Sequence, residues 1–182
     1  MARLLLSLAG VGHGMRVLDL ACGAGALLVP AARLVGPAGL AVGIDLAEPM
    51  AAVAASKLQR LGQSRGVVAV MDAEQLGLRA GRFDVVCCAS AIYLLVDQAA
   101  AVRGWLEMLR PGGTLAVSEF GDLDARWGWK DELLGRLGPL ERMDAAALAA
   151  YRAAVCTAIE ACREADGRLH WRPEVIYVVT SR

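Results

Sequence analysis

The sequence contains few residues of the kinds that bind metals or build disulfide frameworks. It has only two histidines, His13 and His170, and none of its cysteines form a C-x-x-C pair, so the sequence predicts no metal site. The five cysteines are odd in number and lie inside apolar runs, which is typical of reduced thiols. We therefore expect a cytoplasmic protein that holds no metal.

An excess of charge of either sign is also lacking, because Lys plus Arg and Asp plus Glu each number 19. Without a positive field, the chain has nothing to attract the polyanionic backbone of a nucleic acid. The uncharged run at residues 85–96 is far shorter than the roughly 20 apolar residues that cross a bilayer. The apolar stretch at residues 4–9 is short for a signal peptide. We expect no nucleic-acid partner, no membrane span and no secretion signal.

What the sequence does contain is the composition of a folded domain. Hydrophobic residues make up 57% and charged residues 21% of the 182 residues, which is far from the composition of a disordered chain. A chain of this length fits one domain with one core. We therefore predict a single domain over residues 1–182.

Apolar runs that predict strands alternate with helical patterns through the chain. The predicted strands are residues 16–21, 40–44, 66–71, 82–89, 114–120 and 175–180, and the predicted helices end near 35 or cover 49–61, 97–109 and 144–165. Pro30 removes a backbone donor, so we expect the first helix to begin near it or to be kinked. Strands that are apolar on both faces and alternate with helices predict an α/β fold, namely a Rossmann-like, doubly wound, mostly parallel sheet with helices on both faces.

The strongest local signal is VLDLACGAG at residues 17–25, where Asp19 lies in the first strand and Gly23 and Gly25 follow in the turn at its carboxyl end. Ligands bind at that end of a doubly wound sheet, and glycines let a ligand approach the backbone closely. The dinucleotide fingerprint G-x-G-x-x-G requires a third glycine where this sequence has Leu28. The carboxylate of Asp19 would also repel a pyrophosphate, whereas it would attract the cationic methionine end of S-adenosylmethionine (SAM). The charges therefore favour SAM.

Two further acidic residues follow the next two predicted strands. Asp45 lies 20 residues after Gly25, at the end of the second strand, where a carboxylate can accept hydrogen bonds from the ribose hydroxyls. NAD enzymes share this feature, so Asp45 alone does not discriminate between the cofactors. Asp72 follows the third strand and is the discriminating residue, because its carboxylate can accept from the exocyclic amine of adenine.

In order along residues 15–120, the segments VLDLACGAG, GIDLAEPM, MDAEQL, RFDVVCCASAIYLL and LRPGGTLAVSEF resemble a class I SAM-dependent methyltransferase, similar to the ubiquinone and menaquinone biosynthesis group. The resemblance implies a short N-terminal segment (1–15), a cofactor-binding core (16–120), a substrate-side and C-terminal part (121–182), SAM as cofactor and S-adenosylhomocysteine as product. It places these residues in the cofactor site: Asp19, Ala21, Gly23 and Gly25 at the methionine part, Asp45 at the ribose, Leu46 and Met50 beside the adenine, Asp72 and Ala73 at the adenine edge, and Cys88 and Ala89 facing the sulfonium. Ala21 stands where the family usually has glycine.

Two departures from the family concern the parts of the chain outside this core. Members of the group usually carry helices before the first strand that fold over the substrate, and only about fifteen residues precede Arg16 here. They also usually have a helix and a sixth strand before the last strand, for which residues 121–139 are short. We therefore expect a short or missing lid and an abbreviated sheet, whose sixth strand is missing or replaced by residues 168–171 and whose last strand is antiparallel.

No motif identifies a catalytic residue, since methyl transfer depends chiefly on positioning two reactants. Where the acceptor must lose a proton, Tyr93 and Glu119 are the candidates, with Ser118 also near the ends of the fourth and fifth strands and His13 and His170 farther away. Tyr93 is otherwise a wall of the pocket or a packing residue, and Glu119 is otherwise a loop carboxylate. The alternative for each histidine is a surface or packing role. Trp127 and Trp129 either cover a planar substrate or pack a loop onto the core.

We predict a methyltransferase that acts on a small, apolar or aromatic molecule at oxygen or carbon. Residues 89–92 read ASAI where methyltransferases of amide or adenine nitrogens usually have N/D-P-P-Y/F, so those nitrogens are not the expected acceptors. The alternative is a catalytically degenerate SAM-binding protein that acts through a protein partner, with a homodimer through an open sheet edge. A nicotinamide oxidoreductase is the third hypothesis.

Overall fold

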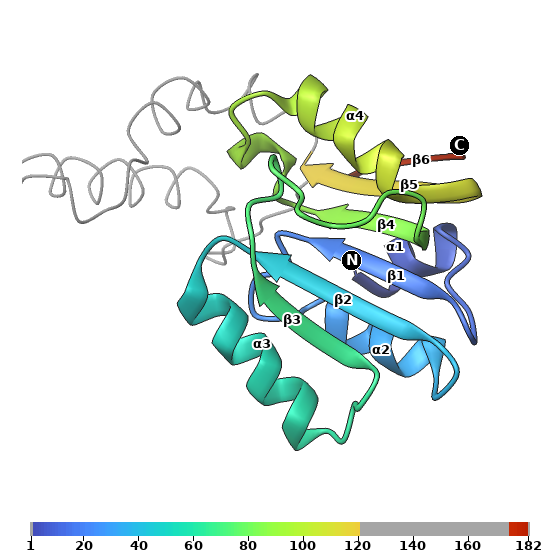
Figure 1. Cartoon of the computed structure of the whole chain (residues 1–182), viewed down its shortest axis with the longest axis vertical. Helices are drawn as coiled ribbons and strands as arrows, with labels where there is room; N and C mark the ends of the chain where they lie inside the picture. Colours follow the sequence, from blue (N-terminus) through green and yellow to red (C-terminus); the bar gives the residue numbers. More distant parts are fainter. Residues whose placement is uncertain (1, 121–174, 182) are drawn as a thin grey trace, which may run out of the picture. The chain divides into compact units, whose positions relative to one another are not determined.

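The structure is a computed structural model that describes residues 2–120 and 175–181 (Figure 1). The chain divides into two compact units, one formed by Met1–Glu119 with Ile176–Arg182 and the other by Phe120–Val175. Among the described residues, the first unit contains every helix and all of the sheet except Phe120 and Val175. The predicted helix at 144–165, the segment 168–171, Trp127, Trp129 and His170 all lie outside the described residues.

The sheet has six strands in the order β3-β2-β1-β4-β5-β6. The strands are β1 (Arg16–Leu20), β2 (Leu40–Asp45), β3 (Gly66–Val70), β4 (Phe83–Ala89), β5 (Leu109–Phe120) and β6 (Val175–Ser181). The pairs β3–β2, β2–β1, β1–β4 and β4–β5 are parallel, and β6 runs antiparallel to β5 (Figure 1). The predicted fold class, a Rossmann-like and mostly parallel sheet whose last strand is antiparallel, is confirmed.

Helices cover the sheet on both faces. Successive side chains of β1 point alternately to the two faces, and each face has its own buried cluster. The helices are α1 (Ala2–Leu8), α2 (Leu28–Val35), α3 (Glu48–Arg60), the 3-10 helix η1 (Ile92–Leu94) and α4 (Gln98–Met108). Val17 points into a buried cluster shared with α1, α2 and α3. Its neighbour Leu18 points into a second cluster, which contains Trp105 of α4. This alternation is the strand period that the apolar runs predicted.

The N-terminal segment folds as a helix that the sequence did not predict. Leu5 and Leu6 of α1 are fully buried and belong to the cluster beneath α2. Of the apolar stretch at residues 4–9, Leu5, Leu6 and Ala9 are therefore core residues, whereas Leu4 and Leu8 are exposed. Burying two leucine side chains contributes about 3 to 6 kcal/mol of transfer free energy, as an upper estimate.

The fifth strand is longer than predicted. Pro111, Gly112 and Gly113 were expected to form a turn before it, but they lie within it. Strand β5 begins at Leu109, and its register against β4 shifts between the pair Phe83–Leu109 and the pair Val85–Thr114. Gly112 has a φ of 75°, which glycine adopts without steric cost. The three residues are therefore accommodated as an irregularity within the strand.

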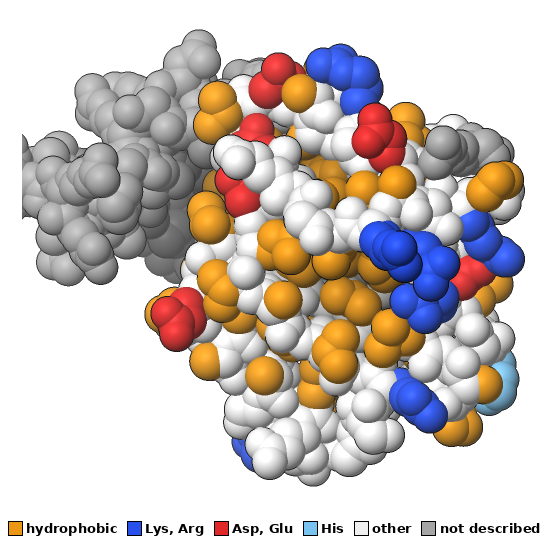
Figure 2. All heavy atoms as spheres, viewed as in Figure 1, with side chains coloured by type: hydrophobic (Ala, Val, Ile, Leu, Met, Phe, Trp, Pro, Cys, Tyr) orange, Lys and Arg blue, Asp and Glu red, His pale blue; other side chains and the backbone are white. Residues whose placement is uncertain are grey.

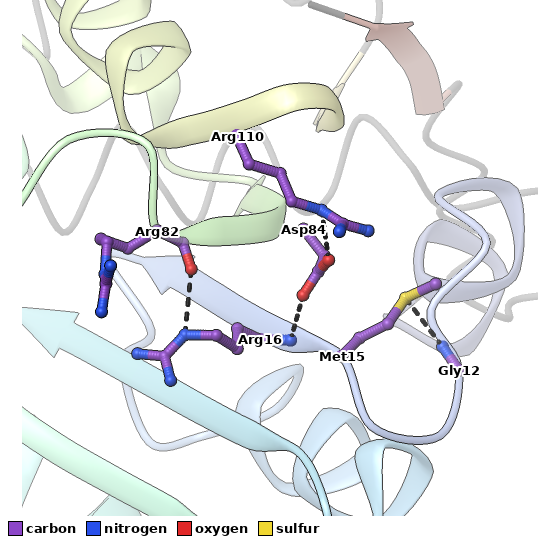
Figure 3. Close-up of polar contacts among 6 residues, drawn as sticks. All are labelled: Gly12, Met15, Arg16, Arg82, Asp84 and Arg110. Atoms are coloured by element: carbon purple, nitrogen blue, oxygen red, sulfur yellow. Dashed lines mark hydrogen bonds and ion pairs between the residues drawn. The ribbon is translucent and has the colours of Figure 1, made fainter.

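The amino ends of β1, β4 and β5 are joined by polar contacts (Figure 3). Asp84 forms an ion pair with Arg110 and accepts a hydrogen bond of 2.6 Å from the backbone N–H of Arg16. The Arg16 side chain donates from Nε to the carbonyl of Arg82 at 3.0 Å, and Gly12 N–H lies 3.3 Å from the sulfur of Met15. Basic side chains gather over this end of the sheet in Figure 2. These amino ends lie opposite the carboxyl ends of the strands, where the predicted cofactor residues lie.

No helix of the described residues is long and apolar enough to cross a membrane. Within residues 2–120 and 175–181, no three His, Cys, Asp or Glu side chains are grouped so that they could hold a metal ion.

Candidate functional site

The parallel register brings the predicted cofactor residues to the carboxyl ends of the strands, which together form one edge of the sheet. Leu20 of β1 pairs with Ile44 of β2 on one side and with Cys88 of β4 on the other, and Asp45 of β2 pairs with Val70 of β3. The segments that follow these strands therefore leave the sheet side by side. Strands β1 and β4 are neighbours at the point where the chain order reverses, which is where doubly wound sheets bind ligands.

The turn after β1 requires left-handed backbone conformations at three positions. Ala21, Gly23 and Gly25 have φ values of 50°, 52° and 81°. A Cβ atom added to Gly25 would lie 3.2 Å from the Cβ of Ala54, so α3 packs closely against the turn there. A Cβ atom at Gly23 would meet only the end of the Met50 side chain, at 3.9 Å. The glycine pair thus serves helix packing at one position and leaves open space at the other.

Polar contacts from β2 and α3 hold this turn. Gly23 N–H donates to Oδ2 of Asp45 at 2.7 Å, and Ala47 N–H donates to Oδ1 of the same carboxylate at 2.8 Å. The side chain of Lys57 donates from Nζ to the carbonyl of Ala24 at 2.8 Å. Each carboxylate oxygen of Asp45 has a second lone pair. Asp45 can therefore organise the turn and still accept hydrogen bonds from the hydroxyls of a ligand.

Asp19 is a buried side chain, although it was expected to border the cofactor. It is 1% exposed, and its Oδ2 has no hydrogen-bond partner. Burial raises the pKa of Asp19 to about 8, against the lowering effect of a hydrogen bond from the backbone of Leu28 and with a smaller rise from nearby Asp45. Asp19 is thus mainly a neutral acid at pH 7 in this structure. A charged Asp19 was expected both to repel a pyrophosphate and to attract the cationic methionine end of SAM, and neither expectation holds at pH 7 here, because desolvation favours the protonated form.

The cysteines of the described residues are packing residues. Burial raises the pKa of Cys22 to about 12 and that of Cys87 well above its usual value, with further rises from the nearby Asp19. Cys88 is buried in the cluster that contains Leu20 and Trp105, whereas Ala89 packs partly buried against the cluster on the other face. Thiols with raised pKa values are poor nucleophiles, and this applies to Cys22 and Cys87. Cys88 presents its side chain to the core at the end of β4, because it is buried there.

The segment after β3 forms a closed turn. The backbone N–H of Glu74 donates to Oδ1 of Asp72 at 2.8 Å, and Gln75 N–H donates to the Asp72 carbonyl at 3.2 Å. Ala73 is buried, and its carbonyl accepts a hydrogen bond of 2.8 Å from Nε1 of Trp105 in α4. Asp72 is half-buried beside this turn. Its carboxylate is therefore held near the end of β3, where a base amine was expected to bind.

Apolar side chains are exposed at the same edge. Leu46, directly after β2, is 70% exposed, and Met50 in the first turn of α3 is 45% exposed. Exposed apolar groups beside carboxylates and open glycine backbone suit an adenosyl group, because it has apolar ring faces and polar edges. The residues present at this edge fit the cofactor that the sequence predicted.

The predicted catalytic residues Tyr93, Ser118 and Glu119 lie after β4 or in the last residues of β5. Tyr93 is half-buried in η1, beyond the end of β4. Glu119 lies in β5, but its side chain is outside the described part of the chain. Ser118 is fully buried, and its hydroxyl has no partner. His13 lies against Gly36, where an added Cβ would be 2.6 Å from the imidazole ring, so it contacts the end of α2 rather than this site.

Three side chains that hold the site were not identified from the sequence. Lys57, Glu74 and Trp105 all bond to backbone atoms far away in the chain. Glu74 lies inside the quoted segment MDAEQL, directly after Asp72 and Ala73, but its partners lie 22 and 23 residues away. Only the spatial neighbours of these side chains show their contribution.

A doubly wound sheet with a glycine turn after β1 and carboxylates at the ends of β2 and β3 defines a nucleoside-cofactor-binding α/β protein. The protein family described as "Methyltransferase domain" matches residues 12–170. This chain belongs to that methyltransferase family. SAM, the cofactor predicted from the sequence, is the cofactor of these enzymes.

Curated relatives cover the same part of the chain. Nocamycin O-methyltransferase of Saccharothrix syringae is 38% identical over 117 residues, which are 64% of this chain and 42% of that protein. The ubiquinone/menaquinone biosynthesis C-methyltransferase UbiE of Pseudomonas putida is 38% identical over 119 residues, 65% of this chain and 46% of the relative. The chain spans less than half the length of these two relatives.

A solved structure supports the fold independently. A SAM-dependent methyltransferase from Aquifex aeolicus has a TM-score of 0.61 and 25% sequence identity, over 65% of this chain and 63% of that one. The suspected resemblance to class I SAM-dependent methyltransferases is thereby confirmed.

Proposed function

We propose that this chain is a SAM-dependent methyltransferase that acts on a small apolar or aromatic molecule, at oxygen or carbon. The observation that carries the proposal is the hydrogen bond between Gly23 and Asp45. It joins the glycine turn to the ribose-side carboxylate beside the exposed apolar side chains of Leu46 and Met50. This combination suits an adenosyl group better than a bare glycine turn does.

Each part of the edge has a proposed role in holding the cofactor. The turn from Ala21 to Gly25 borders the methionine part, with Asp19 beneath it, and Asp45 accepts from the ribose. Leu46 and Met50 lie beside the adenine ring, Asp72 and Ala73 lie at its edge, and Cys88 and Ala89 lie at the end of β4 nearest the sulfonium. When bound, SAM supplies an electrophilic methyl group. The chain's own contribution is positioning, which can supply a large share of the rate enhancement of a displacement.

The acceptor class rests on two considerations. The named relatives methylate at oxygen and at carbon, and the segment after β4, ASAI, does not resemble the motif of amide and adenine methyltransferases. For an acceptor that must lose a proton, Tyr93 and Glu119 are the proposed general bases. We propose a cytoplasmic protein whose partner is this small molecule, with no nucleic acid involved.

The test is a thermal-shift measurement of the purified chain with SAM, S-adenosylhomocysteine and NAD. Ligand at one hundred times its dissociation constant stabilises the folded state by about 2.7 kcal/mol. We expect a rise in melting temperature with both sulfur nucleosides and none with NAD, and loss of the rise in Asp72→Ala. A rise with NAD alone would favour an oxidoreductase. No rise with either sulfur nucleoside would contradict the proposal.

A second measurement separates an enzyme from a binding protein. We expect the chain to transfer methyl groups from SAM to a member of a panel of phenols, quinols and carboxylic acids. Binding of SAM without transfer to any acceptor, together with a stable dimer, would favour the degenerate binding protein instead.

A further inference from the structure

The loop between β4 and α4, residues 90–97, follows the carboxyl end of β4, the strand that pairs with β1. We call it the β4–α4 loop. At its start, Ser90 N–H donates to the carbonyl of Ser118 in β5 at 2.7 Å. In its middle, Leu94 and Leu95 close η1 through bonds to the carbonyls of Ala91 and Ile92. The loop therefore borders the place where an acceptor must approach the cofactor.

The far end of the β4–α4 loop is held by one carboxylate from another part of the chain. Oε2 of Glu74 accepts from Val96 N–H at 3.1 Å, and Oε1 accepts from Asp97 N–H at 2.8 Å. The side chain of Val96 is 96% exposed, so apolar packing does not hold the chain at that residue. Both oxygens of Glu74 thus bind two successive amides at the point where the loop enters α4.

Glu74 belongs to the turn at the predicted adenine edge. Its own N–H is bonded to the carboxylate of Asp72, and the carbonyl of Ala73 is bonded to Trp105 of α4. Asp97 in turn caps α4 by accepting from Ala100 N–H at 2.8 Å. A continuous set of hydrogen bonds therefore runs from Asp72, through Glu74, to the end of the β4–α4 loop.

We propose that Glu74 is a positioning residue that couples the cofactor site to the β4–α4 loop, so that binding of the adenosyl group orders the loop that borders the acceptor. This inference rests on the proposed function. Contact of adenine with Asp72 and Ala73 restricts the turn that carries Glu74, and Glu74 transmits the restriction to the amides of Val96 and Asp97. Because such coupling is reciprocal, an acceptor that orders the loop also tightens cofactor binding.

The experiment is hydrogen–deuterium exchange of the full chain, with and without saturating S-adenosylhomocysteine. In the wild-type chain we expect exchange to slow at least tenfold both in the glycine turn, residues 21–25, and in residues 92–97. In Glu74→Gln, which keeps the side-chain shape but places an amide donor against one backbone N–H, the glycine turn still slows tenfold. Residues 92–97 slow less than twofold in that variant.

A matched control distinguishes coupling from simple anchoring. Asp97→Ala removes the cap of α4 but leaves both amides that bind Glu74. We expect this variant to exchange faster in α4 without ligand while keeping the ligand-induced slowing of residues 92–97. If Glu74 only anchors the loop, Glu74→Gln will raise the exchange of residues 92–97 by the same factor with and without ligand. That result would overturn the inference.

The remaining outcomes separate the inference from the proposed function. If wild-type residues 21–25 slow on binding but residues 92–97 do not, the coupling is wrong and the cofactor site stands. If no segment of the wild-type chain slows and the ligand does not bind, the proposed function fails, and the coupling fails with it.

Discussion

The backbone N–H of Gly23 donates a 2.7 Å hydrogen bond to Oδ2 of Asp45, which ties the turn after β1 to the end of β2. The bond joins two residues that are 22 positions apart. In the proposed function Asp45 therefore has two tasks, one toward the protein backbone and one toward the ribose of the cofactor. Substitutions at Asp45 are therefore expected to affect the cofactor site as a whole.

Asp45→Ala should weaken binding of S-adenosylhomocysteine by about 10- to 100-fold, because loss of a charged acceptor costs about 1.5 to 3 kcal/mol. Isothermal titration calorimetry of the variant and the wild-type chain measures the change. The control is Asp84→Ala at the opposite edge of the sheet, which removes the contacts to Arg110 and Arg16. Equal loss of affinity in both variants would show that the effect is global destabilisation.

Asp19 should make the stability of the protein depend on pH. The pKa of Asp19 is raised from 3.8 to about 8 in the folded state, so between these pH values the folded chain binds a proton that the unfolded chain has released. The free energy of unfolding contributed by Asp19 is therefore fully present below pH 4 and is lost as the pH rises through about 8. The slope approaches about 1.4 kcal/mol per pH unit within this window.

Asp19→Asn carries no titrating group and should lack this slope. Urea unfolding of both proteins at pH 5, 6.5 and 8 measures it, and the variant should gain stability relative to the wild-type chain at each step. Parallel pH dependences of the two proteins would contradict a protonated Asp19.

Ala21→Gly should raise the free energy of unfolding by about 0.5 to 1 kcal/mol. Ala21 has a φ of 50°, a left-handed conformation that costs a residue with a Cβ about 1 to 2 kcal/mol. Glycine avoids this cost, but its larger conformational entropy in the unfolded chain offsets part of the gain in stability. Chemical denaturation measures the difference. Ala55→Gly, at an exposed position inside α3, is the control and should lower stability by about 1 kcal/mol.

Trp105→Phe should lower the free energy of unfolding by about 2 to 3 kcal/mol. The indole N–H donates to the carbonyl of Ala73 in a fully buried setting, so its removal leaves a buried acceptor without its donor and a small cavity. Chemical denaturation at pH 7 tests this. A loss below about 0.5 kcal/mol would indicate that water or a shifted side chain satisfies the carbonyl.

Much of the fold could be predicted from local patterns. The alternation of strands and helices gave bounds close to those of β1, β2 and α3, including Pro49 in the first turn of α3. Asp97 was expected at the start of the helix that became α4, where its side chain caps Ala100. These features depend on residues that are near one another in the chain, so the sequence carries their signal directly.

Other features depended on neighbours that the sequence does not name. The apolar residues of α1 could not be assigned to the core from the sequence, because they are buried by packing against α2. Pro111 to Gly113 suggested a turn, but pairing with β4 absorbs them into β5. The ligand contacts proposed for Asp72, Cys88 and Ala89 remain predictions.

The sequence by itself determined that a mostly parallel sheet would form and that Asp45 and Asp72 would follow neighbouring strands at one edge, because strand period and chain order are local properties. Only the tertiary structure decided that Asp19 is a buried, protonated acid and that Glu74 binds the amides of Val96 and Asp97. Desolvation and long-range hydrogen bonds depend on which groups the fold brings together, and no local pattern records them.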